Sequence, residues 1–185
     1  MDFDYDLSQC LQSLRNNGSI AFPSPTGWQL ACDAMDELAV DRLKGKSISS
    51  SISIFIASNR DLLKYVAAPD PAVFDFLDSI DRPTTIVFEN GLGLANNALN
   101  DDGSVSIRVV QDDFSKHLIK RFGKPLAVAD LAYADNSIHP NSNQIDPTWY
   151  NLCDYIAENL EGRLPLKTAN WVKWNDGPTP IAVRP

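Results

Sequence analysis

Side chains able to do acid–base, nucleophilic or metal chemistry are few and scattered along the 185-residue chain. His117 lies in a predicted helix and His139 precedes a proline, and neither has the neighbours of a metal site or a catalytic triad. Cys10, Cys32 and Cys153 are an odd set with wide spacing. Such a set fits neither a disulfide framework nor a zinc site and is typical of a reducing compartment. We therefore predict surface histidines, no metal centre and a cytoplasmic location.

Two features could nevertheless belong to a binding site. The stretch FPSPTGWQLACDA (22–34) puts two prolines, a threonine, a glycine and a tryptophan directly after the apolar run GSIAF. A turn this constrained shapes either a site or a corner of the fold. Arg108 stands inside the apolar segment SVSIRVV and needs a partner if it is buried. That partner would be an acidic side chain or a ligand phosphate.

Common catalytic and nucleotide-binding motifs are absent. G-x-S-x-G, H-E-x-x-H and C-x-x-C do not occur, and the G-L-G at 91–93 is typical of a hairpin loop rather than of a dinucleotide fingerprint. A net charge of -8 argues against a broadly basic nucleic-acid surface but leaves room for a local basic pocket. No apolar run approaches the roughly 20 residues that span a bilayer. The acidic start MDFDYDLSQC is not a signal peptide.

Helical and extended patterns alternate along the chain and predict one α/β domain over residues 1–185 with a mixed sheet. The predicted helices cover 7–16, 36–44 with Asp36 as cap, 59–67, 70–80, 112–122 and 148–160. The predicted strands cover 19–23, ended by Pro23, then 51–57, 84–89, 104–110, 125–130 and a C-terminal pair at 170–175 and 180–184. Residues 131–147 show no sustained period, and so long a loop is often functional.

In this order the segments resemble the YrdC family of threonylcarbamoyl-AMP synthases. The family's Y-P-T-D-T-V-Y-G-L-G-C-D-A and the following A-V-x-R-I are met by FPSPTGWQLACDA and AVDRL. The family's P-G-P-x-T-L-V-L corresponds to DRPTTIVF here, and its G-x-V-x-V-R-x-P corresponds to GSVSIRVV. Its P-L-V-A-T-S-A-N corresponds to PLAVADLA. Each piece is weak, but the ordered series covers nearly the whole chain without large insertions.

The resemblance implies a twisted open sheet of mixed parallel and antiparallel strands, with helices on both faces and a concave, positively lined cleft. It implies ATP, threonine and bicarbonate as substrates, magnesium as an assisting ion, and threonylcarbamoyl-AMP made for tRNA modification. Family members are also described as binding double-stranded RNA or tRNA, which the net charge of this chain disfavours. The positions that the resemblance assigns to ligand binding are Thr26, Trp28, Lys44, Lys46, Thr85, Arg108, Asp130, Ala132 and Arg184.

Departures from the family pattern fall on the residues that would touch the ligand. The family's K-x-R is met by Lys44 and Lys46, which keep the charge but lose the bidentate fork of arginine. The serine and asparagine of S-x-N are replaced by Asp130 and Ala132. A carboxylate about 4 Å from a phosphate charge costs several kcal/mol at an effective dielectric near 20, which lowers nucleotide affinity by orders of magnitude. Asp130 could instead bind magnesium or pair with a lysine.

The retained residues also have structural interpretations. Lys44 and Lys46 could be the solvated end of a helix. Thr26 could satisfy the backbone of a turn, and Thr85 could be an ordinary strand residue. Trp28 fits the core or a cleft wall better than a base stacker.

Three functions therefore remain open. The chain could be an active synthase, a divergent relative that binds a nucleotide, an RNA or another anion with weakened or lost catalysis, or an interaction protein with a vestigial cleft. We favour the second. The pair Asp130 and Ala132 distinguishes the first from the second. Convergence of Lys44, Lys46 and Arg108 on a cavity would distinguish the second from the third.

Overall fold

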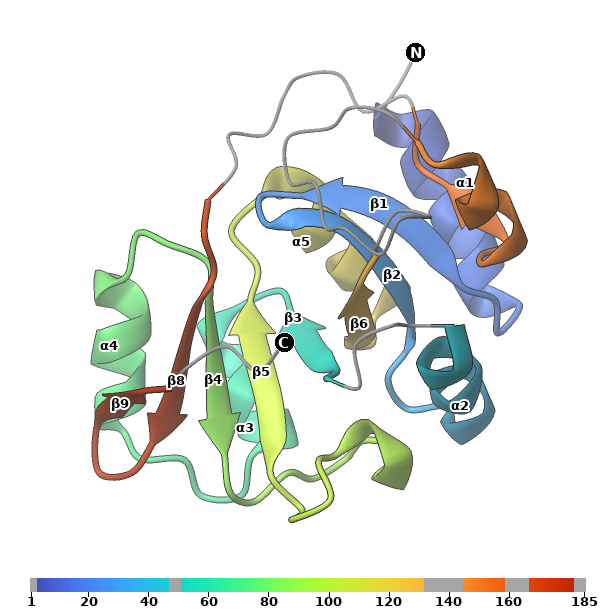
Figure 1. Cartoon of the computed structure of the whole chain (residues 1–185). Helices are drawn as coiled ribbons and strands as arrows, with labels where there is room; N and C mark the ends of the chain where they lie inside the picture. The colour runs from blue at the N-terminus through green and yellow to red at the C-terminus, as the bar shows by residue number, and fades with distance from the viewer. Residues whose placement is uncertain (1–2, 47–50, 132–144, 159–166, 182–185) are drawn as a thin grey trace.

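The computed structural model describes residues 3–46, 51–131, 145–158 and 167–181 (Figure 1). Its centre is a sheet of nine strands in the order β7-β1-β2-β6-β3-β5-β4-β8-β9. The strands are β1 Ile20–Ser24, β2 Gly27–Asp33, β3 Ser53–Ile56, β4 Thr84–Phe88, β5 Val105–Val109, β6 Leu126–Asp130, β7 Tyr155–Ile156, β8 Asn170–Trp174 and β9 Pro178–Pro180. The pairs β1–β7, β3–β5 and β4–β8 are parallel and the others antiparallel. The predicted mixed sheet is confirmed.

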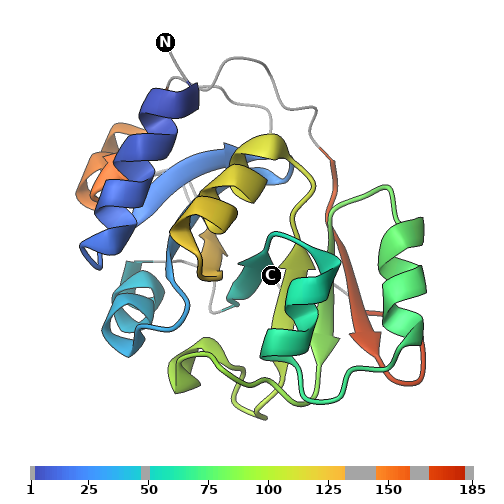
Figure 2. The same cartoon turned by 180° about the vertical axis from the view of Figure 1, so that it is seen from behind.

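Helices pack on the sheet because successive side chains along its strands point alternately into two apolar clusters. The helices are α1 Phe3–Arg15, α2 Glu37–Lys46, α3 Leu62–Tyr65, α4 Ala72–Ser79 and α5 Asp113–Phe122, with short 3-10 turns η1 Asn59–Asp61, η2 Asn96–Ala98 and η3 Pro147–Asn151. Ile54 and Ile56 join the cluster that α2, α3 and α4 complete, whereas Phe55 joins the cluster under α1 and α5. Figure 2 shows α1 and α5 side by side across the sheet.

The constrained stretch after GSIAF forms a β-hairpin. The prediction that Pro23 ends the first strand is wrong, because β1 continues to Ser24 and pairs with β2 down to Ser24 opposite Gly27. Pro25 and Thr26 form the two-residue turn. Proline is tolerated within β1 because β7 pairs only with Ile20 and Ala21, so Pro23 has β2 on one side and no described strand on the other.

The second wrong prediction is the helix over 148–160. The chain there forms η3 and then β7, which pairs with the first two residues of β1. Asp154 accepts a hydrogen bond from the Ser19 amide at 2.7 Å, and the Ala157 amide donates to the Ala21 carbonyl at 2.8 Å. Hydrogen bonds to the edge of β1 therefore hold this segment in the sheet.

The strand β2 was not predicted, and the strand predicted at 180–184 overlaps β9 only at Pro180, with residues 182–184 outside the described residues. The remaining elements lie close to their predicted positions. The helix predicted over 59–67 is η1 and α3, and ends at Tyr65. The loop around the G-L-G connects the antiparallel strands β4 and β5, as predicted. Asp112 caps α5 through the Ser115 amide at 2.8 Å, and Gly123 ends it in the left-handed conformation. Residues 132–144 of the long predicted loop lie outside the described residues, and no helix in the described ranges is long and apolar enough to cross a membrane.

Gly18 provides a test of how α1 joins the sheet. Its amide donates to the Ser13 carbonyl at 2.8 Å, and a Cβ at Gly18 would lie 2.8 Å from that oxygen and 2.9 Å from Asp154 Oδ2. We expect Gly18→Ala to lower the free energy of unfolding by about 1–3 kcal/mol, because the close approach forces backbone shifts. Urea denaturation measures this change.

Gly45 is the matched control, because a Cβ there meets nothing within 4 Å and the residue lies in α2. Gly45→Ala should raise the free energy of unfolding by up to about 1 kcal/mol through helix propensity. Equal effects of the two substitutions would contradict the packing argument at Gly18.

Candidate functional site

Arg108 is the centre of the candidate site. It lies on β5, paired with Thr85 on β4 and with Phe55 on β3. Its Nε donates to Thr85 Oγ1 at 2.9 Å, and its guanidinium carbon lies 5.0 Å from the centroid of the Phe55 ring. The residue is only 7% exposed. Cross-strand register and a cation–π contact therefore hold a cation inside the protein.

The tip of the β1–β2 hairpin supplies the next contact. Thr26 Oγ1 accepts a hydrogen bond from Arg108 Nη1 at 2.9 Å. Ser24 Oγ lies 3.1 Å from Thr26 Oγ1, accepts from the Thr26 amide and donates to the Gly27 carbonyl. The hairpin turn thus presents two linked hydroxyl groups to Arg108, so this turn shapes a polar site rather than only a corner.

No acidic side chain among the described residues forms a hydrogen bond or ion pair with Arg108. Its hydrogen-bond partners are the hydroxyls of Thr26 and Thr85, and within those residues it forms no ion pair. Burial lowers the pKa of Arg108 to about 10, and the charge of Asp130 partly opposes this change. The guanidinium remains charged at neutral pH with neutral hydrogen-bond partners.

Asp130 joins the same group of residues through Gln29. The two residues are register partners on β6 and β2, and Gln29 Nε2 donates to Asp130 Oδ1 at 2.9 Å. Gln29 Nε2 also lies 3.5 Å from Thr26 Oγ1, at the limit of a hydrogen bond. We call Ser24, Thr26, Gln29, Thr85, Arg108 and Asp130 the arginine network. Asp130, its exposed end, pairs with an amide and not with a lysine.

Sequence reasoning missed Gln29 and Phe55. Gln29 is 2% exposed and lies between buried Trp28 and Leu30. A polar residue in such an apolar segment (WQLAC) was an available signal, because a buried amide needs hydrogen-bond partners. Phe55 gave no signal, because its sequence neighbours are those of any buried strand.

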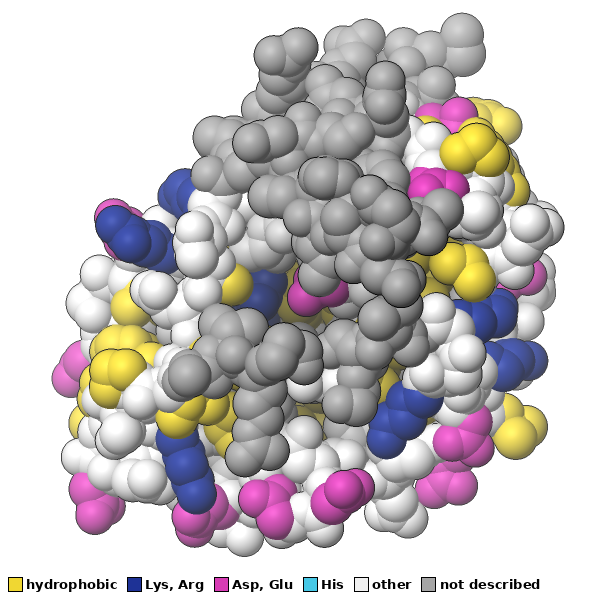
Figure 3. Space-filling view, in the orientation of Figure 1, with side chains coloured by type: hydrophobic (Ala, Val, Ile, Leu, Met, Phe, Trp, Pro, Cys, Tyr) yellow, Lys and Arg dark blue, Asp and Glu magenta, His cyan; other side chains and the backbone are white. Residues whose placement is uncertain are grey.

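A small cavity adjoins the arginine network. It has a volume of about 20 Å³ and is lined by Ser24, Pro25, Thr26, Phe55, Pro83, Arg108, Val109, Val110, Gln111 and Asp112. This volume accommodates about one water molecule and not a nucleotide. On the face drawn in Figure 3, hydrophobic side chains lie beside a few charged ones.

Lys44 and Lys46 lie in the last turn of α2, exposed and half-buried respectively. Neither has a hydrogen bond or ion pair within the described ranges, so contacts do not connect them to the arginine network. Burial raises the pKa of Cys153 to about 11, and the charge of Lys46 opposes that rise. Lys46 therefore lies near Cys153. The predicted convergence of three cations is not present as direct contacts.

The remaining predicted positions are divided between the core and the undescribed residues. Trp28 is 9% exposed, and its ring centroid lies 5.3 Å from that of Trp149. This placement matches the core interpretation. Ala132 and Arg184 lie outside the described residues.

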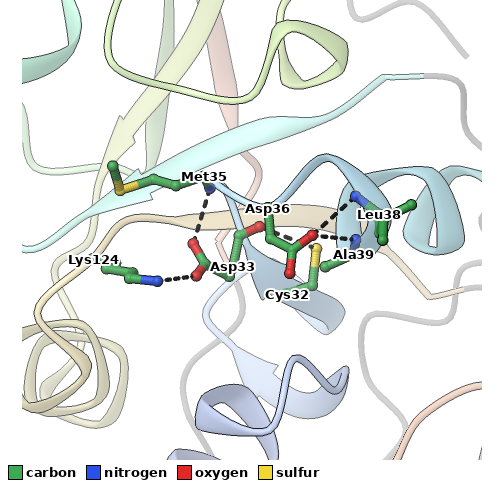
Figure 4. Close-up of polar contacts among 7 residues, drawn as sticks. All are labelled: Cys32, Asp33, Met35, Asp36, Leu38, Ala39 and Lys124. Atoms are coloured by element: carbon green, nitrogen blue, oxygen red, sulfur yellow. Dashed lines mark hydrogen bonds and ion pairs between the residues drawn. The ribbon is translucent and has the colours of Figure 1, made fainter.

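The second half of the constrained stretch orients α2 (Figure 4). Buried Asp33 accepts a hydrogen bond from the Met35 amide at 2.9 Å and forms an ion pair with Lys124 at 2.5 Å. Asp36 caps α2 by accepting from the amides of Leu38 and Ala39, as predicted. These two carboxylates fix the helix that carries Lys44 and Lys46.

His117 is exposed, as predicted, and packs edge-on against Phe3. His139, the other histidine, lies outside the described residues. Burial raises the pKa of Cys32 to about 12, so its thiol stays protonated at neutral pH. The described ranges contain no group of three or more His, Cys, Asp or Glu side chains that could hold a metal ion.

Comparison with known proteins agrees with this fold. A threonylcarbamoyl-AMP synthase of Stenotrophomonas maltophilia is 25% identical over 168 residues, which cover 88% of this chain and 90% of that protein. The crystal structure of E. coli YciO superposes with a TM-score of 0.75 at 18% identity, covering 97% of this chain and 89% of YciO.

A third similar protein is P. abyssi Sua5, whose crystal structure was solved in complex with L-threonine. It superposes with a TM-score of 0.70 at 18% identity. The match covers 93% of this chain and 52% of Sua5, so this chain spans about half the length of that relative. The family model for Sua5, YciO and YrdC, described as telomere recombination, matches residues 12–168. This match covers most of the mixed sheet and the arginine network, and the chain belongs to the Sua5/YciO/YrdC family.

Proposed function

We propose that this chain is a divergent member of the family that binds an adenine nucleotide or another small anion in the family's cleft, with weakened or lost synthesis of threonylcarbamoyl-AMP. One observation carries the proposal. Arg108 is a buried cation whose hydrogen-bond partners among the described residues are neutral hydroxyls. A cytoplasmic location and a single domain over 1–185 stay predictions from the sequence.

Burying Arg108 costs free energy that its present contacts offset only in part. A guanidinium has five N–H donors, and two of them bind Thr26 and Thr85. The cation–π contact with Phe55 contributes about 0.5–2 kcal/mol. An anion at the adjoining cavity would supply the missing charge and accept the remaining N–H donors. The cavity is small, so it would receive one polar group of a larger ligand.

Asp130 is the reason to expect weak catalysis. It stands where the family has the serine of S-x-N, and Gln29 fixes the carboxylate at the edge of the network. At this position its charge acts on Arg108 and would repel a phosphate. Asp130 is also the residue of the network that would hold magnesium, since this ion binds proteins through one or two carboxylates together with substrate phosphates. Bound magnesium would supply charge neutralisation there.

The S. maltophilia relative is named a threonylcarbamoyl-AMP synthase. For this reason the adenylate of threonine carbamate is the first class of ligand to test. Duplex RNA is disfavoured as a partner by the net charge of -8. Isothermal titration with ATP, with and without magnesium, threonine and bicarbonate, measures binding, and pyrophosphate release from the same sample measures turnover. We expect binding with little or no release. Rapid release would establish an active synthase, and no binding at millimolar ATP would overturn the proposal.

A paired substitution tests whether the Arg108 charge serves a ligand rather than the fold. We expect Arg108→Met combined with Thr85→Val to keep or raise the free energy of unfolding, because it removes a buried charge and leaves no unpaired Thr85 hydroxyl. Affinity for ATP should fall by roughly 30-fold or more, since a lost charged hydrogen bond costs about 2–5 kcal/mol. Urea denaturation and calorimetric titration measure the two quantities.

The double variant is compared with Thr85→Val alone, which keeps the arginine. If the double variant unfolds much more easily than wild type and Thr85→Val does not, Arg108 has a structural role and the anion argument fails.

Restoring the family residues at Asp130 and Ala132 tests the explanation for weak activity. Asp130→Ser with Ala132→Asn should raise ATP affinity by about tenfold or more, because a repulsive carboxylate is replaced by a hydroxyl. Pyrophosphate release should rise with it. Asp101→Ser, at an exposed loop carboxylate, is the control for total charge. Equal effects of the two changes would show that net charge, and not the position of Asp130, limits binding.

A further inference from the structure

We infer that a second pocket, separate from the arginine network, binds a small molecule that combines an apolar or aromatic body with one acidic group. The pocket has a volume of about 220 Å³. It lies between α3, the C-terminal end of α5 and the adjoining ends of β3 and β6. Its lining residues are Ile56, Ala57, Asp61, Lys64, Tyr65, Ile119, Lys120, Gly123, Lys124 and Pro125.

This pocket shares no lining residue with the arginine network or with the small cavity beside it. Pro125 lines the pocket and directly precedes β6, whereas Asp130 is the last residue of that strand, about 17 Å further along the extended chain. Arg108 lies nearer, because its register partner Phe55 directly precedes Ile56 of the pocket lining. Figure 2 shows α3 and α5 on the side of the sheet turned toward the viewer there, away from the face seen in Figure 1.

One side of the pocket is an apolar wall, and the rest of its lining is polar or charged. Ile56 is 1% exposed, and Ala57 and Ile119 are 6% exposed each, so only small parts of these side chains reach the pocket. The half-buried ring of Tyr65 adds to this wall. Such a concave surface can contact one flat, ring-sized group.

Three lysines, from α3, from α5 and from the loop after α5, surround this apolar wall. Lys124 is paired with buried Asp33 at 2.5 Å (Figure 4), and Lys64 with Asp61 at 2.8 Å. Lys120 is exposed and has no ion pair within the described ranges. The three lysines and the carboxylates of Asp33 and Asp61 leave a local net charge of +1, on a chain whose net charge is -8. This local charge attracts an acidic group on a ligand, such as a phosphate monoester with about -1.5 to -2 charge at neutral pH.

Tyr65 adds a hydrogen-bond donor. Its hydroxyl has no hydrogen bond within the part of the chain that the structure describes. Tyr65 lines the pocket together with Asp61, Lys64 and Lys124. Burial raises the pKa of the Tyr65 hydroxyl. It stays protonated at neutral pH and can donate to an acidic ligand.

These features exclude two simpler interpretations. Lysines that only stabilise the C-terminal end of α5 would need no concave apolar wall, and Lys64 belongs to α3. A site for free phosphate alone would leave that wall without a contact. The volume lies below the 300–1,000 Å³ typical of sites for drug-sized ligands, so the body should be about one ring.

The test uses phenyl phosphate as the probe, with phenol and inorganic phosphate as partial probes. Backbone amide NMR of the labelled full chain follows each titration at neutral pH. We expect phenyl phosphate to saturate with a Kd on the order of 1 mM and to shift the amides of residues 56–57, 65 and 119–124. Phenol and phosphate should each bind at least tenfold more weakly. Equal binding of phosphate and phenyl phosphate, shifts confined to other residues, or no binding would overturn the inference.

Lys120→Gln should weaken phenyl phosphate binding at least fivefold without changing stability, because Lys120 is exposed and has no described ion pair. Lys116→Gln is the matched control, one turn earlier on α5 and outside the pocket lining. If both variants lost the same affinity for phenyl phosphate, the effect would come from the total charge of the chain, and the proposed site would be rejected. The Arg108→Met, Thr85→Val variant should bind the probe as wild type does, so failure of the proposed function and failure of this inference are distinguishable.

Discussion

The buried charge of Arg108 is the constraint on which the site depends. A guanidinium taken out of water needs hydrogen-bond acceptors for its N–H groups and a favourable electrostatic surface. Here the acceptors are hydroxyls from β4 and from the tip of a hairpin, and the surface is the Phe55 ring on β3. The contacts require that β3, β4 and β5 pair in one register and that the β1–β2 hairpin reaches Arg108. A shift of one residue in β5 would turn Arg108 to the other face of the sheet and remove every contact.

Positive side chains line both described cavities although the net charge of the chain is -8. Each cavity also has one acidic side chain in its lining, Asp61 in the larger and Asp112 in the smaller. Asp130 and Asp33 have different roles in this arrangement. Asp33 is buried and neutralises Lys124, so it stabilises the fold, whereas Asp130 is exposed and held by an amide, so its charge faces the site. The position of each carboxylate, and not the number of carboxylates, decides which of them acts on Arg108.

Local patterns predicted those elements whose causes are local. The strands β3 to β6 and the cap at Asp36 each follow from neighbours within a few residues. The wrong predictions share a different cause. Pro23 is accommodated because most of β1 has a strand on one side only, and residues 155–156 are extended because they pair with β1. Both facts depend on a strand far away in the sequence, which a local pattern does not contain.

The order of weak motifs along the chain identifies the family, and the same motifs include Arg108, Thr26 and Thr85. The folded sheet shows further that these three side chains meet and that Gln29 holds Asp130. It also shows that Lys44 and Lys46 make no contact with them in the described residues. The motifs do not contain these contacts, and the physical reason is that Thr26 and Arg108 are 82 positions apart. Their hydrogen bond depends on strand register and on the path of a hairpin, and both are set by the packing of the whole sheet.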